Sequence, residues 1–300
     1  MNSAPHQHRH GPPAHDRAFA LGVALNLGFV IVEVAFGVLA HSTALIADAG
    51  HNLSDVLGLA LAWGAGVLAR RLPTPRRTYG LRRTTILAAV ANAGLLFVAM
   101  GAIALEAVQR LATPAPVVAG TVIAVAAAGV AVNLGTALLF RSGHTHDLNV
   151  RGAYLHMAAD AAVSLGVVAA GLGIRWTGWL WLDPVASLGI VVVVILGTWG
   201  LLRDSLNLAL DAVPAGIDPA EVQRYLAGIP GVTEVHELHI WAMSTTDAAL
   251  TAHLVIPTAP TGDALVEEIS AELHRRFGIE HATLQIERRM VGLRPPMARS

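Results

Sequence analysis

Long apolar stretches separated by short polar segments occupy the first two-thirds of the chain. The stretches cover residues 18–40, 43–69, 84–111, 115–140, 150–174 and 178–202. Each holds about 20 residues or more, enough at ~1.5 Å per residue for a helix to cross a hydrocarbon core of ~30 Å. A chain inside lipid must pair its own backbone polar groups, so these stretches are expected to be helices. The pattern predicts a polytopic α-helical membrane domain with six transmembrane helices over residues 17–205.

The hydrophobic pattern changes after about residue 210. Asp218 followed by Pro219 is typical of a helix start. The periodicities predict helices over residues 218–227 and 263–277 and strands over residues 232–243, 248–256 and 283–288. This αββαβ order predicts a small α+β domain over residues 206–292. Outside the two domains lie a histidine-containing tail, residues 1–16, and a C-terminal tail, residues 293–300.

Composition supports a membrane protein and excludes several function classes. Hydrophobic residues make up 54% of the chain and charged residues 14%, against about 25% charged in soluble domains. Together with a mean hydropathy of +0.56, this excludes a disordered chain and an ordinary soluble enzyme. The absence of cysteine excludes disulfides, thiolate metal sites and iron–sulfur clusters. No basic cluster with interleaved aromatic residues indicates nucleic-acid binding.

Arginine is unevenly distributed between the loops. Residues 70–83 carry six arginines and residues 141–151 carry two, whereas the loops at the other membrane face are short. Positive loops are typical of the cytoplasmic side, so we expect both termini in the cytoplasm. The chain has no lysine and is rich in Arg, Ala and Gly, which indicates a bacterium with GC-rich DNA. We therefore expect a multi-pass protein of the inner (plasma) membrane.

Two His-x-x-x-Asp motifs lie inside apolar stretches. His51 and Asp55 form the first, and His156 and Asp160 form the second. Residues four apart share one helix face, with Cβ atoms ~5–6 Å apart. If the two faces meet, two imidazoles and two carboxylates form a tetrahedral N2O2 set that suits Zn²⁺. The alternative is that all four are ordinary polar residues paired with neighbouring helices.

Charge balance indicates what such a site does. Two carboxylates neutralise one divalent cation, and without it they tend to bind protons in a low-dielectric site. Histidines take up protons near neutral pH as well. Metal and protons therefore compete for the same atoms, which is the chemistry of a metal/proton antiporter. The closed ligand set and the absence of a His-Glu-x-x-His motif argue against an enzyme.

Two further acidic residues lie in apolar stretches. Asp48 precedes His51 on the same side of its helix and is either an access ligand or a polar residue near the helix end. Glu33 either lines the pathway and relays protons or forms a hydrogen bond between helices.

These segments resemble the cation diffusion facilitator family, in particular its zinc-transporter-like members. The resemblance lies in residues 47–55 (Ala-Asp-Ala-Gly-His-Asn-Leu-Ser-Asp), in residues 148–160, in Asp183-Pro184, in Gly231-Val232 and in residues 236–241 (His-Glu-Leu-His-Ile-Trp). It covers roughly residues 17–290. It implies six transmembrane helices, a cytoplasmic ferredoxin-like domain, a homodimer and proton-coupled efflux of divalent metal. A histidine at position 51 implies a preference for zinc.

The resemblance also implies site residues. The transport ligands would be His51, Asp55, His156 and Asp160. The cytoplasmic ligands would be His236, His253 and Glu287, joined by His6, His8 or His10 from the tail of a neighbouring protomer. The resemblance further implies a charge interlock, that is, an ion pair between Arg83 and Asp211 that joins the loop to the second domain. On the residues alone, these are equally well explained as two unrelated charges in solvent. The loop over residues 70–83 has no His or Asp, so we expect no metal site there.

Strand alternation makes one further prediction for the second domain. His236 and His239 are three residues apart and should point to opposite faces unless a bulge intervenes. His239 and Trp241 would then pack against a helix. Residues 211–300 hold seven arginines against twelve acidic residues, so bound Zn²⁺ would relieve repulsion between two such domains and favour a dimer.

The favoured function is therefore export of Zn²⁺ from the cytoplasm in exchange for H⁺, by alternating access. Zn²⁺ would be both the substrate and a bound ion of the cytoplasmic domain. The expected partners are Zn²⁺, H⁺, membrane lipid and a second copy of the chain, and not nucleic acid. Two alternatives stay open: the same mechanism for Cd²⁺, Co²⁺, Ni²⁺ or Mn²⁺, and a membrane metal sensor.

Overall fold

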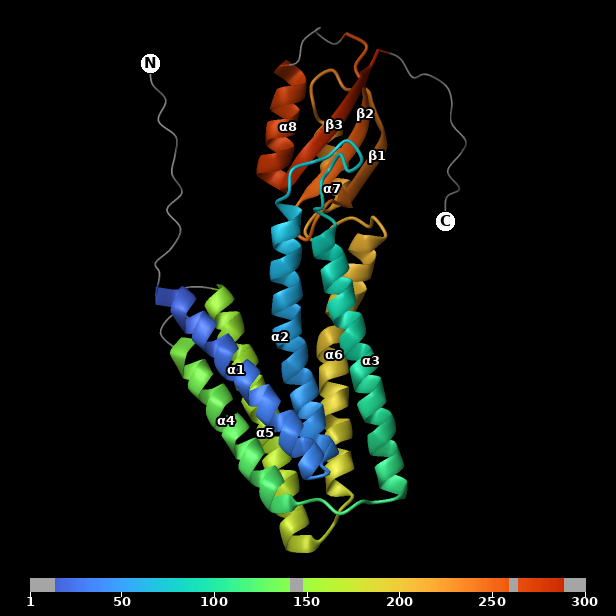
Figure 1. Cartoon of the computed structure of the whole chain (residues 1–300). Coiled ribbons are helices and arrows are strands. Elements are labelled where there is room, and N and C mark those ends of the chain that lie inside the picture. The colour runs from blue at the N-terminus through green and yellow to red at the C-terminus, as the bar shows by residue number, and fades with distance from the viewer. Residues whose placement is uncertain (1–13, 141–147, 259–263, 289–300) are drawn as a thin grey trace. The chain divides into compact units, whose positions relative to one another are not determined.

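The structure, a computed structural model, describes residues 14–140, 148–258 and 264–288. It divides into two compact units, residues 1–59 with 94–198 and residues 60–93 with 199–300. Six helices come first along the chain (Figure 1). They are α1 (Ala14–Leu39), α2 (Thr43–Ala69), α3 (Thr84–Ala112), α4 (Ala119–Phe140), α5 (Leu148–Thr177) and α6 (Leu182–Ala209).

Five of these helices are long and apolar enough to cross a membrane, judged over the described residues alone. They are α2 to α6. Within α1, Ala24–Leu39 forms a shorter apolar helix. The chain is thus a multi-pass membrane protein, and its helix bounds follow the apolar stretches of the sequence closely.

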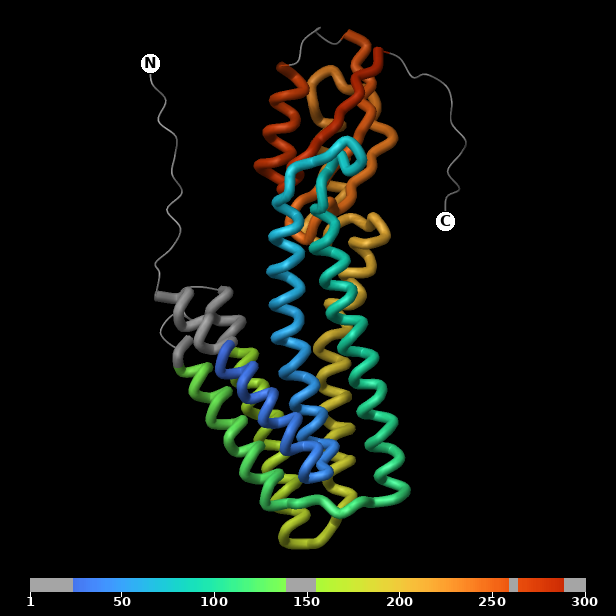
Figure 2. Tube along the Cα trace, viewed as in Figure 1, coloured from blue at the N-terminus to red at the C-terminus, as the bar shows by residue number. Residues whose placement is uncertain are grey.

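Small residues let the helices of the first unit approach closely. Figure 2 shows α1, α4 and α5 running side by side. A Cβ atom at Gly129 of α4 would lie 2.7 Å from the Phe29 ring of α1, and one at Gly171 of α5 would lie 2.8 Å from Ile123 of α4. In lipid the hydrophobic effect does not drive helices together, so van der Waals contact at such closely packed backbones supplies much of the attraction. The helices that carry the two His-x-x-x-Asp motifs belong to this unit.

Asp183 connects the start of α6 to the start of α2. Its side chain is 1% exposed and accepts hydrogen bonds from the Thr43 backbone N–H and Oγ1, both at 2.7 Å, and from Ser42 Oγ. The first N–H groups of a helix have no partner within the helix, and an anion there is stabilised by the helix dipole. Asp183 therefore caps α2 and fixes where that helix begins.

We predict that Asp183→Ala lowers the free energy of unfolding by about 2–4 kcal/mol, because buried hydrogen-bond donors lose a charged acceptor. Unfolding of the full chain in mixed micelles, titrated with a denaturing detergent, measures the change. Asp204→Ala is the matched control, since Asp204 is an exposed carboxylate on the same helix. Equal stabilities of the two variants would contradict the role of Asp183.

The second unit contains a helix–strand–strand–helix–strand domain. Its elements are α7 (Pro219–Ala227), β1 (Glu234–Ala242), β2 (Ala248–Val255), α8 (Ala264–Phe277) and β3 (Ile279–Glu287). The sheet order is β1-β2-β3, with β1 antiparallel and β3 parallel to β2. Asp218 caps α7 as expected, with its Oδ1 2.9 Å from the Ala220 N–H. β3 begins earlier than the sequence pattern indicates, because Gly278, with φ +67°, turns the end of α8 directly into the strand.

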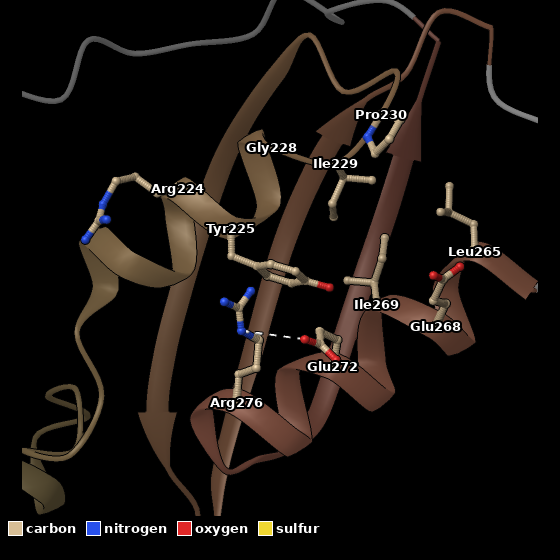
Figure 3. A pocket seen from close by; sticks show the side chains of 10 residues that line it. All are labelled: Arg224, Tyr225, Gly228, Ile229, Pro230, Leu265, Glu268, Ile269, Glu272 and Arg276. Carbon is tan, nitrogen blue, oxygen red and sulfur yellow. Dashed lines mark ion pairs between the residues drawn. The ribbon is translucent and has the colours of Figure 1, made fainter.

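Both helices of this domain cover the same face of the sheet. Leu250 and Leu254 of β2 are buried in one core with Leu226 of α7 and Leu273 of α8. A hollow of about 660 Å³ lies between α7 and α8 (Figure 3). Among its lining residues, the Glu272 carboxylate pairs with Arg276.

A β-bulge in β1 overturns the expected placing of His239. The register shifts between His236 and His239, and Glu237 between them has φ +48°. The extra residue reverses the alternation, so His236 and His239 share the sheet face that the helices leave uncovered. His239 is 59% exposed and lies 3.1 Å from the Glu237 carboxylate. The expectation that it packs against a helix was wrong.

Candidate metal centres

The two His-x-x-x-Asp motifs meet within the first unit. His51 Nε2 of α2 lies 3.3 Å from Asp160 Oδ1 of α5, and His156 Nε2 of α5 lies 3.1 Å from Asp55 Oδ2 of α2. Each histidine thus contacts the carboxylate of the opposite helix. Within the motifs the separations are 3.9 Å for His51 and Asp55 and 3.7 Å for His156 and Asp160.

The geometry of these four residues suits a small cation. Ligand atoms of His51, Asp55 and Asp160 all lie within 4.8 Å of one another. The two imidazole rings are 6.1 Å apart and nearly perpendicular, at 80°. Two nitrogen and two oxygen donors at such separations match the tetrahedral shell of zinc, whose bonds to these atoms are ~2.0–2.2 Å. The Asp160 side chain is 3% exposed and that of His156 is 44% exposed, so the cluster opens on the His156 side.

A second polar cluster in the same unit contains Glu33 and Asp48. Asn52 Nδ2 donates to Glu33 Oε2 at 3.0 Å, and Ser164 Oγ donates to Asp48 Oδ2 at 2.8 Å. Both carboxyl groups are fully buried, and each keeps one oxygen without a hydrogen-bond partner among the described residues. Glu33 therefore bridges α1 and α2 through Asn52, and Asp48 bridges α2 and α5 through Ser164.

The cytoplasmic residues implied by the sequence also come together. Glu287 Oε1 lies 2.9 Å from His253 Nδ1, and Glu287 Oε2 lies 3.3 Å from His236 Nε2. The two imidazole rings are 5.0 Å apart, and ligand atoms of all three residues lie within 4.8 Å of one another. The bulge that follows His236 leaves it opposite His253 in the register of β1 and β2. Three candidate ligands from three strands therefore form a partly buried triad.

Comparison with known proteins identifies the family. A model of the cation efflux transmembrane domain matches residues 19–208, and one of the cation efflux protein cytoplasmic domain matches residues 214–289. The chain belongs to the cation diffusion facilitator family. It is therefore a cation efflux protein of the membrane, and nothing in the family indicates an enzyme.

Several curated relatives of this cation efflux protein cover nearly its whole length. The cation efflux system protein CzcD of Alcaligenes sp. is 40% identical over 95% of this chain and 90% of its own. The zinc transporter ZitB of Escherichia coli is 41% identical over 90% and 86%. The cadmium, cobalt and zinc/H(+)-K(+) antiporter of Bacillus subtilis is 33% identical over 93% and 91%.

The charge pair implied by the family resemblance forms in the second unit. Arg83 donates to the Asp211 carboxylate, and Asp211 has φ +60°. Both side chains are more than half exposed, so their attraction adds little stability. A neighbouring contact, Arg82 to Asp247 at 3.3 Å, was not expected from the sequence. The tail residues His6, His8 and His10 lie outside the described residues.

Three hydrogen-bond donors to these acids were not predicted from the sequence. Ser164, Asn52 and Gln285 each donate to one of the acids above, Gln285 to Glu287 Oε1 at 2.9 Å. Asn52 and Gln285 each lie next to or near a proposed ligand in the chain, and Ser164 lies one turn after Asp160, on the same helix face. Their spacing from the proposed ligands is the signal in the sequence from which these contacts could have been predicted.

The surroundings of Glu287 predict a pH effect. Burial raises the pKa of the Glu287 carboxyl, but hydrogen bonds with His253 and His236 lower it more, so the pKa lies below its usual value. Ionised Glu287 thus stabilises the fold above its unfolded pKa of about 4.3, and this is lost as pH falls through the lower folded pKa. We predict that metal-free wild type melts at a higher temperature than Glu287→Gln at about pH 6, with the gap closing toward about pH 3. A gap that stays constant over this range would contradict the prediction.

Proposed function

We propose that this protein exports Zn²⁺ from the cytoplasm in exchange for protons, with the ion held by His51, Asp55, His156 and Asp160. The observation that carries the proposal is the crossed pairing of these residues, each histidine facing the acid of the opposite helix. Two carboxylates balance the charge of one divalent ion in a site where an unbalanced charge is costly. The names of the relatives, which include zinc transporters and a metal antiporter, support it.

Proton coupling follows from shared ligand atoms. A metal-bound imidazole must be neutral and a metal-bound carboxylate ionised, so protons arriving at these atoms expel the ion. Ion and protons then take turns as the site faces each side of the membrane. The four residues come from two helices only, so a shift of α2 against α5 would open or distort the whole ligand set. Alternating access needs no covalent step, which fits a transporter.

The two imidazole and two carboxylate donors favour zinc and reduce the number of other metal ions that the site would accept. Imidazole and carboxylate suit Zn²⁺ in tetrahedral geometry, whereas Mn²⁺ prefers an all-oxygen shell. Cd²⁺ and Co²⁺ fit the same donors, and the Bacillus subtilis relative is named for cadmium, cobalt and zinc. We therefore propose Zn²⁺ as the principal ion and Cd²⁺ and Co²⁺ as competing substrates.

The proposal extends to the whole assembly. We infer six spans with both termini in the cytoplasm, a ferredoxin-like cytoplasmic domain and a homodimer in the inner membrane. The triad of His236, His253 and Glu287 would hold a resident Zn²⁺ that favours the dimer. The charge interlock of Arg83 with Asp211 would join the loop after α2 to the start of the cytoplasmic domain.

We also propose that Glu33 and Asp48 hold one proton between them and pass it to the metal site. Both carboxyl groups are fully buried, each keeps one oxygen without a partner, and neither is paired with an arginine in the described part of the chain, so burial favours a proton on them. That proton would satisfy the two oxygens that otherwise lack a partner. Asp48 precedes His51 by about one helical turn, which places the pair beside the ligands.

The first test of the proposal is transport by Asp160→Asn. Reconstituted into vesicles with a pH gradient, the wild type should move Zn²⁺ and the variant should fall to the level of empty vesicles, because the amide cannot balance the charge of the ion. Asp204→Asn, an exposed acid on α6, should transport like the wild type. Zn²⁺/H⁺ exchange by Asp160→Asn at the wild-type rate would contradict the site.

The second test concerns the proton pair. Glu33→Gln keeps an oxygen that can accept from Asn52 but cannot carry a proton. We predict that it binds Zn²⁺ within about threefold of the wild-type affinity, since it touches no ligand, but releases up to about one proton fewer on binding. Calorimetry in buffers of different ionisation enthalpy measures this number. Glu106→Gln is the control, because Glu106 is half-exposed and paired with Arg110; proton release by Glu33→Gln equal to that of the control would contradict the relay.

A further inference from the structure

The loop that joins α2 to α3, residues 70–83, carries positive charge that the proposed function does not use. We name it the basic loop; it has six arginines and no acidic residue. Thr74 and Arg77 form an antiparallel bridge, with N–H to O distances of 3.0 and 2.9 Å. Gly80 has φ +70°, donates to the Arg77 carbonyl, and would bring a Cβ to 3.0 Å from the Arg71 carbonyl. The backbone of the loop is therefore folded into one compact shape (Figure 1).

Most of this charge has no counter-charge within the protein. Arg82 pairs with Asp247, and Arg83 pairs with Asp211. The other four arginines are exposed and form no ion pair with any described residue; they are Arg70, Arg71, Arg76 and Arg77. Four like charges in one short loop repel one another, so the loop is stabilised by an external anion.

The arginines also border a hollow. Its volume is about 340 Å³, within the ~300–1,000 Å³ range of small-ligand pockets. The polar and aromatic side chains at its walls are Arg76, Arg77, Arg82, Arg83, Tyr79 and Trp241. Guanidinium groups bind phosphate oxygens in pairs of parallel hydrogen bonds, and Arg is preferred to Lys where that geometry matters. The wall therefore suits a phosphate group rather than an uncharged or apolar ligand.

The position of the loop indicates the source of the phosphate. It starts directly after Ala69, the end of the apolar helix α2, and ends directly before Thr84, the start of α3. The arginines therefore lie where two membrane-crossing helices leave the lipid. Leu72 is 85% exposed, so an apolar side chain of the loop is available to lipid, whereas the Tyr79 ring lies against His281 of β3. Thr85 Oγ1 accepts from the Thr245 N–H of the cytoplasmic domain at 3.1 Å, which places the loop on the side of the membrane where that domain lies.

We propose that the basic loop binds the phosphodiester headgroup of an anionic phospholipid in the cytoplasmic leaflet. Arg76 and Arg77, which form no ion pair with a described residue, supply the main contacts, and Leu72 lies against the lipid beside them. The headgroup balances the charge of the loop, which also holds the cytoplasmic domain through Arg82 and Arg83. The inference does not depend on which ion the protein carries.

Binding of soluble short-chain lipids to the full chain in detergent tests the proposal. Dioctanoyl-phosphatidylglycerol should bind, with an affinity that falls as salt rises, and dioctanoyl-phosphatidylcholine should not. Each arginine near an anionic surface is worth about fivefold in binding, so Arg76→Gln with Arg77→Gln should weaken phosphatidylglycerol binding about 25-fold. The charge-matched control is Arg224→Gln with Arg275→Gln, two exposed arginines of α7 and α8, which should bind like the wild type.

Two further measurements separate the possible outcomes. Arg76→Lys with Arg77→Lys keeps the charge and should retain most of the affinity, which distinguishes lost binding from a loop that fails to fold. Inorganic phosphate at the same concentration should bind far more weakly than phosphatidylglycerol. Equal binding of phosphatidylglycerol by the Gln pair and its control would overturn the proposal, and so would inorganic phosphate that binds as tightly as the lipid.

Discussion

A carboxylate buried in a membrane needs a positive charge or a proton, and this need organises the first unit of the structure. Asp160 is 3% exposed on a membrane-crossing helix, where an isolated negative charge is costly. Its partners are the imidazole of His51 on another helix and that of His156 on its own. α2 and α5 meet at this point, where each histidine faces the acid of the opposite helix.

The other buried acids of the first unit differ in what faces them. Asp183 accepts hydrogen bonds from the start of α2, so its charge is satisfied by fixed donors and its role is structural. Glu33 and Asp48 each have one neutral donor and one oxygen left over, which leaves room for an exchangeable proton. The same residue type thus meets different partners, fixed donors at the start of a helix in one case and a single neutral side chain in the others. In the second unit, Glu287 has two imidazoles as partners and is suited to a resident ion.

Much of the architecture could be predicted from the sequence, because it depends on periodicities that are local. The helix bounds follow the apolar stretches, and His51 with Asp55 share a face since they are four residues apart. The cap at Asp218 also follows from local chemistry. Features of the tertiary structure have no such local pattern in the sequence. The bulge at Glu237 reversed the face of His239, and the contact of Arg82 with Asp247 joins residues far apart in the chain. Only the resemblance to a family linked Arg83 with Asp211 before the structure placed them together.

X-ray absorption at the zinc edge tests the central claim most directly. The protein would carry Ala in place of His6, His8, His10, His236 and His253, which removes the other proposed zinc ligands, and one equivalent of Zn²⁺ would be added. The account predicts a four-coordinate shell at about 2.0 Å with two imidazole and two carboxylate ligands. A six-oxygen shell without imidazole scattering would contradict it.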